Sequence, residues 1–267
     1  MSAVDIFGDC GTSSSSGPRG PAGKDGFDIV KWLPKFVLSQ FQKSEELCCF
    51  VINDLGKDLE KSGEDYVKWI SRSDKKKNAV AIKPSKSIKL IKKEHWGLKF
   101  NSSLYHIALV PISSLQCVFA CVTFQLDGEN EQFIFNDFID DADEKVRGVS
   151  ATRNSIIIWG VDNVSNYISI PFKIDKDAWT TVLVEWLPDK VQGEYIINNK
   201  ENGTFTCNKV PEFHSDDVYL GGRIDSKKSL SGSISAFEIY RSKEKTPASI
   251  KDLVVRGQMD ISPGSVN

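Results

Sequence analysis

The residues of this chain that come nearest to a catalytic arrangement are its carboxylates. A glycoside hydrolase places two carboxylates on either side of a glycosidic bond. Side chains two positions apart on a strand point to the same face, so a catalytic pair on one strand would recur at that spacing. Glu185 in the segment VLVEWLP has no such companion, and the chain holds neither a Gly-x-Ser-x-Gly turn nor a phosphate-binding loop. The sequence therefore predicts a protein that is not an enzyme.

An acidic loop at residues 137–143 could supply oxygen ligands to a calcium ion. Its carboxylates belong to Asp137, Asp140, Asp141 and Asp143. Their spacing differs from that of an EF-hand loop. The composition favours a solvated acidic loop, with Ca²⁺ binding as the alternative, and no other cofactor is expected.

The cysteines and histidines are not spaced for a zinc site. The chain has 6 cysteines and 3 histidines, with no Cys-x-x-Cys pair among them. Cys48, Cys49, Cys117 and Cys121 lie in apolar runs, where a free thiol packs as a small hydrophobic side chain. We interpret them as reduced core residues, and disulfide bonding is the alternative.

Tryptophan is the residue type here that is best suited to stacking on a sugar ring. Most of the 6 tryptophans are expected in the core. Trp96, between His95 and Gly97, is the one we expect to be exposed and is the candidate ligand-binding residue. Three Asn-x-Ser/Thr sequons, which matter only in a secreted chain, begin at Asn101, Asn163 and Asn202.

A glycine recurs at every third position in the stretch GPRGPAGKDG. The glycines are Gly17, Gly20, Gly23 and Gly26. This period is the requirement of a collagen triple helix, whose crowded axis leaves no room for a Cβ. The alternative is a plain Gly/Pro linker. A tract this short would form a triple helix only if a neighbouring segment held three chains together, so the collagen-like interpretation predicts a homotrimer.

Charge and hydropathy exclude several classes of partner. The formal net charge is −2, from 34 basic and 36 acidic residues, so no global positive field exists to attract nucleic acid. No apolar run approaches the length of a transmembrane helix, and the N-terminus lacks the pattern of a secretion signal. We therefore expect neither nucleic-acid binding nor membrane insertion.

The order of compositions along the chain predicts five parts. Apolar residues at Ile29, Leu33 and Phe36 have helical spacing, and Thr246-Pro247 has the pattern of a short C-terminal helix start. The N-terminal amphipathic helix could form a neck between three chains or pack on its own domain. The parts are a flexible arm (1–16), the collagen-like tract (17–26), the helical neck (27–47), a β-rich head (48–258) and a loose tail (259–267).

Short segments rich in Val, Ile, Phe, Tyr and Trp fill the head, without helices between them. This succession predicts an all-β sandwich or jelly roll. The segments are 48–52, 65–71, 78–83, 98–101, 105–110, 116–126, 131–137, 155–161, 167–172, 179–187, 194–200, 217–223 and 232–240.

The last third of the head carries a recognisable succession of motifs. A tryptophan strand from Trp179 precedes a hairpin with a polar turn near Asn198-Asn199, and the strand ending in Leu220-Gly221-Gly222 follows. The segment then closes with Gly232, Ile234, Phe237, Ile239 and Tyr240. This succession resembles concanavalin A-like, laminin-G-like jelly rolls, which implies an antiparallel sandwich. The broken alternation after Ile234 also predicts a bulge at Ser235-Ala236.

The layout of arm, collagen-like tract, neck and jelly-roll head resembles trimeric fibre or attachment proteins of viruses and virus-derived elements. That resemblance implies a non-enzymatic homotrimer on a virion surface, with a head that binds a glycan or protein receptor. The alternative is a secreted, extracellular collagen-like lectin or defence and adhesion protein.

Overall fold

The computed structural model describes most of the segment expected to form the head. The described residues are 44–51, 59–62, 65–70, 79–82, 88–92, 96–101, 104–108, 117–137, 147–161, 163–187, 191–198, 201–207, 217–223 and 228–242. The expected arm, collagen-like tract, C-terminal helix and tail, and residues 27–43 of the expected neck, lie outside them.

Within the described residues, one sheet has eight strands. Its members are β1 (Ser44–Val51), β5 (Lys89–Lys92), β6 (Trp96–Asn101), β8 (Cys117–Leu126), β13 (Thr180–Leu187), β14 (Gln192–Ile197), β15 (Glu201–Phe205) and β17 (Ser231–Ser242). The strand order is β15-β14-β13-β8-β17-β6-β5, and β1 pairs with the far end of β17. The longest strand, β17, lies near the C-terminal end of the head, and its pairing with β1 brings the N-terminal end of the head beside it.

The other sheet has nine strands in the part of the chain that the structure describes. Its members are β2 (Leu59–Ser62), β3 (Asp65–Trp69), β4 (Ala79–Ile82), β7 (Leu104–Ala108), β9 (Gln132–Asn136), β10 (Gly148–Thr152), β11 (Ser155–Trp159), β12 (Tyr167–Pro171) and β16 (Asp217–Leu220). The strand order is β12-β11-β10-β9-β16-β7-β4-β3-β2. The strand β16 lies between β7 and β9, far from both in sequence, as a Greek-key connection requires.

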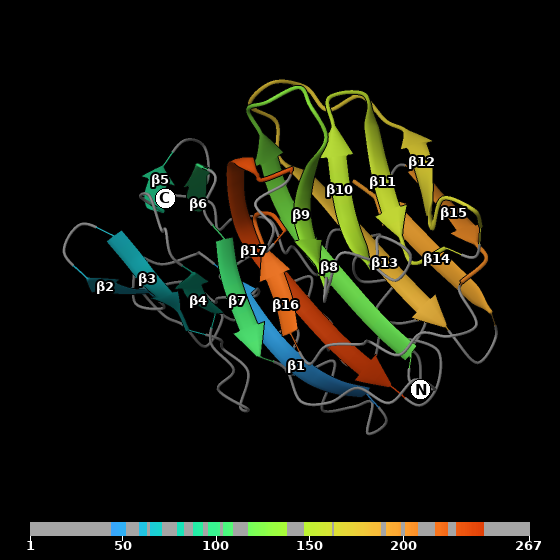
Figure 1. Ribbon diagram of the computed structural model, residues 1–267, viewed down its shortest axis with the longest axis horizontal. Helices are drawn as coiled ribbons and strands as arrows, with labels where there is room; N and C mark the ends of the chain where they lie inside the picture. Colours follow the sequence, from blue (N-terminus) through green and yellow to red (C-terminus); the bar gives the residue numbers. More distant parts are fainter. Residues whose placement is uncertain are drawn as a thin grey trace, which may run out of the picture.

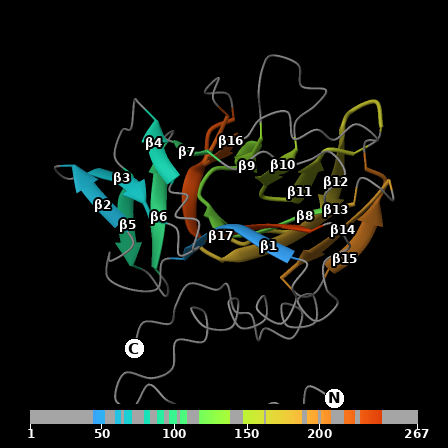
Figure 2. The same ribbon diagram turned by 90° about the horizontal axis from the view of Figure 1, so that it is seen from below.

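The two sheets face each other as the layers of a sandwich (Figures 1 and 2). Every strand pair within them is antiparallel, as in β13 with β8 and β9 with β10. The described residues contain no helix, and so none that is long and apolar enough to cross a membrane. The expected all-β antiparallel sandwich is confirmed.

The core between the sheets is built by alternation along the strands. On β13, Val182, Val184 and Trp186 belong to the core cluster, whereas the side chains between them point to the opposite face. The ring of Phe135 on β9 lies 5.1 Å from the ring of Phe237 on β17, which joins the two layers. Each aromatic ring buried in this way contributes about 1.5–3 kcal/mol by removal from water.

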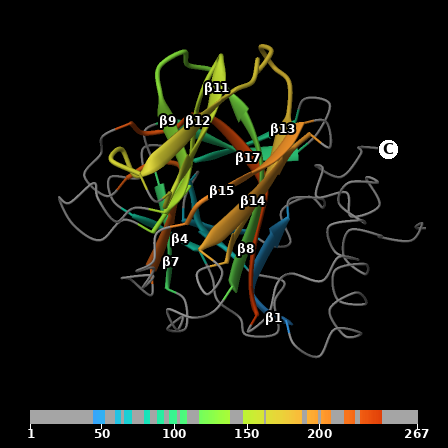
Figure 3. The same ribbon diagram turned by 90° about the vertical axis from the view of Figure 1, so that its right-hand side faces the viewer.

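The last strands of the two sheets, β12 and β15, lie on the same side of the sandwich (Figures 2 and 3). An antiparallel bridge between Val161 and Cys207, which follow β11 and β15, ties the sheets together there. Both side chains are buried. This side is therefore closed by backbone pairing as well as by packing.

Each expected strand segment has a counterpart, and four strands were not expected. These are β2, β5, β10 and β15. The strand β2 has mostly exposed side chains, and β15 carries Gly203 at its centre, so neither shows an apolar pattern. One boundary was wrong. Residues 44–47, expected to end the helical neck, belong to β1, because their backbone pairs with the end of β17 from Ser44 opposite Ser242 onward.

Local irregularities expected from the jelly-roll motifs are present. The register of β17 against β8 shifts between Ile234 and Ala236, which confirms the bulge. Gly221 has a φ of 86° directly after β16, where a side chain would be strained. Asn198 has a φ of 48° in the turn between β14 and β15, and its side-chain oxygen accepts a bond from the backbone N–H of Thr181.

Candidate functional site

A cluster of aromatic and charged side chains lies on the outer face of the nine-stranded sheet, away from the core. We call it the aromatic–cation site. Its members are Glu131, Phe133, Ser150, Trp159, Tyr167 and Lys228. The strands β9, β11 and β12 supply the rings, β10 supplies the serine, and the segment before β17 supplies the lysine.

Strand register places these side chains on one face. Trp159 pairs directly with Tyr167, and residues paired across antiparallel strands point to the same side. Ser150 is opposite Phe133 on β9. The neighbouring Ile158 points the other way, into the core. Phe133 and Trp159, with Ile157, accordingly form a hydrophobic cluster separate from the core.

The three rings form a continuous row. The ring of Trp159 lies 4.8 Å from that of Tyr167 and 5.3 Å from that of Phe133, with interplanar angles of 47° and 35°. These distances are in the range of favourable aromatic pairs. The row runs from a fully buried end at Phe133 to a partly exposed end at Tyr167.

A chain of hydrogen bonds joins the polar members. The indole Nε1–H of Trp159 donates to the hydroxyl of Ser150 over 2.8 Å, and that hydroxyl donates to Oε1 of Glu131 over 2.8 Å. The ammonium of Lys228 donates to Oε2 of Glu131 over 2.6 Å. Glu131 thus holds a serine on one oxygen and a lysine on the other, which fixes its orientation.

Cations lie against the rings. The ammonium of Lys228 is 5.5 Å from the ring centre of Trp159 and 5.8 Å from that of Phe133. The guanidinium of Arg223, which is buried, is 5.7 Å from the ring centre of Phe133. Separations below about 6 Å are those of cation–π contacts.

Two residues at the site have strained backbones. Lys228 has a φ of 51°, and Asn166, directly before Tyr167, has a φ of 56°. Neither is glycine, and residues held in this region cost about 1–2 kcal/mol each. The carbonyl of Lys228 accepts a hydrogen bond from the N–H of Phe133 over 2.8 Å, which anchors the strained segment to β9.

The exposed edge of the site combines one ring with one cation and one carboxylate. Tyr167 is 36% exposed. The side chains of Lys228 and Glu131 are 39% and 23% exposed. An exposed ring beside donors and acceptors suits a ligand with an apolar face and hydroxyl groups.

A polar hollow of about 340 Å³ lies at the loop end of the sandwich. The loops β8–β9, β10–β11 and β12–β13 surround it, at the top of Figure 1. Arg153 joins the three loops, because its guanidinium donates to the carbonyls of Asp127 and Asp175 over 3.0 and 3.3 Å. Asp127 also forms an ion pair with Lys99 on β6.

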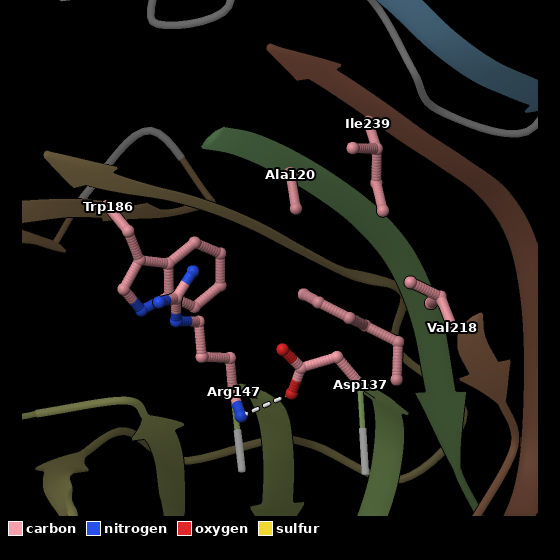
Figure 4. A pocket seen from close by; sticks show the side chains of 7 residues that line it. Ala120, Asp137, Arg147, Trp186, Val218 and Ile239 are labelled. Carbon is pink, nitrogen blue, oxygen red and sulfur yellow. Dashed lines mark hydrogen bonds between the residues drawn. The ribbon is translucent and has the colours of Figure 1, made fainter. Parts of the chain in front are cut away.

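A third feature lies between the sheets. Asp137 and Arg147 line an internal cavity of about 10 Å³ together with Trp186 (Figure 4). A cavity of this size holds at most one water molecule, so it is no ligand site. Burial raises the pKa of Asp137 to about 7, although the charge and the N–H of Arg147 oppose that shift. Burial lowers the pKa of Arg147 to about 10.

One residue that was expected at a surface site, Asp137, is buried in the structure. Asp137 of the acidic loop points into the sandwich beside Arg147 and is buried, so it is not available to a surface calcium ion. The other carboxylates of that loop lie outside the described residues. Among the residues that are described, no group of three His, Cys, Asp or Glu side chains could hold a metal ion.

Other expected residues have different outcomes. Trp96 begins β6, and its side chain lies outside the described part, as do Gly17, Gly20, Gly23 and Gly26. Glu185 is fully buried on β13 and has no access to a substrate. Cys121 and Cys207 are buried free thiols, which agrees with the interpretation of reduced core cysteines for Cys121.

The residues of the aromatic–cation site were not singled out from the sequence. One signal was present in SIIIW (155–159), which is apolar at every position after the serine. A strand that is apolar on both faces must be buried on both. No local sequence pattern marks Lys228 and Glu131 as site residues, because they pair with each other although they lie 97 positions apart in the chain.

No protein-family model matches this sequence, and no curated protein matches it in sequence. Solved structures share its fold. A structure of botulinum neurotoxin type C superposes with a TM-score of 0.55 at 9% identity, over 83% of this chain and 53% of that one. The binding domain of serotype D gives 0.51 at 16% identity, over 80% and 52%. The receptor-binding domain of mosaic serotype C/D gives 0.51 at 12%, over 80% and 51%. This chain spans about half the length of each toxin chain, and the likeness shows the β-sandwich fold.

Proposed function

We propose that this protein is a non-enzymatic glycan-binding protein and that the aromatic–cation site is where the glycan binds. The observation that carries the proposal is the exposed ring of Tyr167 packed against that of Trp159, with the charged ends of Lys228 and Glu131 on the same face. A sugar presents an apolar ring face and a rim of hydroxyl groups. Tyr167 matches the first, and the ion pair matches the second.

The site is preorganised for such a ligand. Glu131 is held by Ser150 and Lys228, so little side-chain freedom remains to be lost on binding. The strained φ of Lys228 is consistent with a position kept for binding. The toxin whose structure shares this fold is described as entering cells through interaction with two ganglioside molecules, and gangliosides carry glycan head groups. This supports a glycan as the ligand class.

A glycan array with sialylated, neutral and uronic-acid-containing glycans tests the proposal. We expect the wild-type protein to bind at least one glycan class, and Tyr167→Ala to weaken that binding by about tenfold or more, since it removes a stacking ring. Val164→Ala on the same hairpin is the matched control, because Val164 is fully exposed and outside the site. Equal binding by both variants would exclude the site, and a blank array would exclude the function.

We further propose that the chain is a trimeric attachment protein located on a virion surface, in which the collagen-like tract forms a stalk. Its basis is the glycine period of the tract followed by an apolar helical pattern. So short a triple helix needs the effective concentration that a trimerised neighbour provides. Gly23→Ala should therefore increase protease cleavage within 17–26 and leave the head folded. Sedimentation of the wild-type chain as a monomer would refute the trimer.

The second candidate is a secreted lectin or adhesion protein. Asn101, Asn163 and Asn202, the first residues of the three sequons, are all exposed. Exposure is a requirement for glycosylation in the secretory pathway. Mass spectrometry of the native protein distinguishes the candidates: occupied sequons favour the secreted protein, and unmodified Asn163 and Asn202 favour the attachment protein.

A further inference from the structure

We infer that the ligand is an extended oligosaccharide that runs along the outer face of β11 and β12, from the aromatic–cation site to the polar hollow. This inference rests on the proposed function and adds the length and direction of the ligand. It treats the two surface features as the ends of a single binding surface.

The first step is the face that connects them. On β12, the side chains of Tyr167, Ser169 and Pro171 are exposed, whereas Ile170 between the last two is buried. Ser155 and Ile157 on β11 pair with Pro171 and Ser169 and share this outer face. The five residues of β12 from Tyr167 to Pro171 span about 13 Å, since four steps along the strand separate the first from the last. The connecting face is therefore short. Its exposed side chains after Tyr167 are Ser169 and Pro171, both small, which leaves room for a chain of sugars, whereas Ile157 on β11 is buried.

The second step concerns the end of the proposed binding surface that lies at the polar hollow. Lys173 follows Pro171 after one residue and lines the hollow, together with Asn154 of the β10–β11 turn. The hollow also contains Lys176 and Glu129, both exposed. In the described part of the chain neither of these two has an ion pair or hydrogen bond. They offer one donor and one acceptor to a sugar that reaches the hollow.

The third step is rigidity. The N–H of Ile174 donates to the carbonyl of Arg153 over 2.8 Å, and the N–H of Phe172 donates to that of Asn154 over 3.1 Å. Gln125 donates to the carbonyl of Asp177 from beneath the same loop. The hollow and the end of β12 are thus one preformed unit, which limits the conformational entropy lost when a long ligand binds.

Calorimetric titration with disaccharides and hexasaccharides of cellulose, xylan and hyaluronan tests the inference on the full chain. We expect the hexasaccharide of the series that binds to have at least about tenfold higher affinity than its disaccharide. The double variant Glu129→Gln with Lys176→Ser should abolish that gain and leave disaccharide affinity unchanged. Lys89→Ser, at an exposed lysine of the other sheet, is the control for the loss of a surface lysine.

The outcomes separate the inference from the proposed function. If disaccharide and hexasaccharide bind equally, the extended surface is wrong while glycan binding stands. A length-dependent gain that survives the double variant places the far end elsewhere and also overturns the inference. If no series binds, both this inference and the proposed function are excluded for linear glycans. Tyr167→Ala should weaken both lengths, because it removes the shared end.

Discussion

The carboxylate of Asp137 accepts a 2.5 Å hydrogen bond from the backbone N–H of Arg147 inside the sandwich. The backbone N–H of Asp137 donates in turn to the carbonyl of Arg147 over 3.0 Å. These bonds join the end of β9 to the start of β10. An acidic group at this position is buried together with a basic group, so its ionisation is coupled to folding.

We expect the stability of the protein to fall as the pH rises from about 4 to about 7. Burial raises the pKa of Asp137 from its ordinary 3.8 to about 7, so the folded state binds a proton that the unfolded state has released. The stabilisation is fully present below the unfolded pKa and is lost as the pH passes through the folded pKa. Urea unfolding between about pH 4 and pH 7 measures this slope.

The variant Asp137→Asn should flatten that slope, because the amide cannot ionise but still accepts the bond from Arg147. Asp175→Asn is the matched control, since the side chain of Asp175 is 70% exposed. An unchanged slope in Asp137→Asn, or the same flattening in both variants, would show that another group causes the pH dependence.

We expect Gly160→Ala to destabilise the sandwich by about 2–4 kcal/mol. Gly160 has a φ of 89°, and a Cβ there would lie 2.7 Å from Cγ of Arg147 and 3.1 Å from Nε1 of Trp186. Both neighbours are buried and cannot move freely. Val164→Ala is a suitable comparison, because the side chain of Val164 is fully exposed. Equal midpoints in thermal unfolding would refute the clash.

The sequence predicted the sandwich because strand alternation is a local property. Val182, Val184 and Trp186 alternate with residues of the outer face within one strand, and this pattern needs no knowledge of the partner strands. Strand β15 was not separated from β14, since Gly203 and the exposed residues around it have no apolar period. Such a strand is held by backbone hydrogen bonds to its neighbour, and the hydrophobic pattern of a single segment does not predict that pairing.

The candidate site could not be predicted in the same way. Glu131 and Lys228 form their ion pair across the fold, and only the pairing of β9 with β10 brings Ser150 between Glu131 and Trp159. Asp137 was expected in a solvated loop because an acidic run is usually exposed. Its burial depends on a basic partner, Arg147, on the other side of that loop.

Lys228 offers a test that separates binding from folding. Its φ of 51° is unfavourable for any residue with a Cβ, so Lys228→Gly should be more stable than Lys228→Ala by about 1 kcal/mol. Both variants lose the ion pair to Glu131 and the cation near Trp159. We therefore expect equal loss of glycan binding in the two variants, with different unfolding free energies. A difference in binding that follows stability would show that the lysine has only a structural role.

We expect the hydrogen bond between Trp159 and Ser150 to contribute measurably to the free energy of unfolding. Ser150→Ala leaves the buried indole N–H of Trp159 without its acceptor, which costs about 1–3 kcal/mol. Trp159→Phe removes the donor and part of the ring, and the double variant should then lose less than the sum of the two single variants. Urea unfolding of the four proteins completes this cycle. Additive losses would mean that the bond contributes nothing to stability.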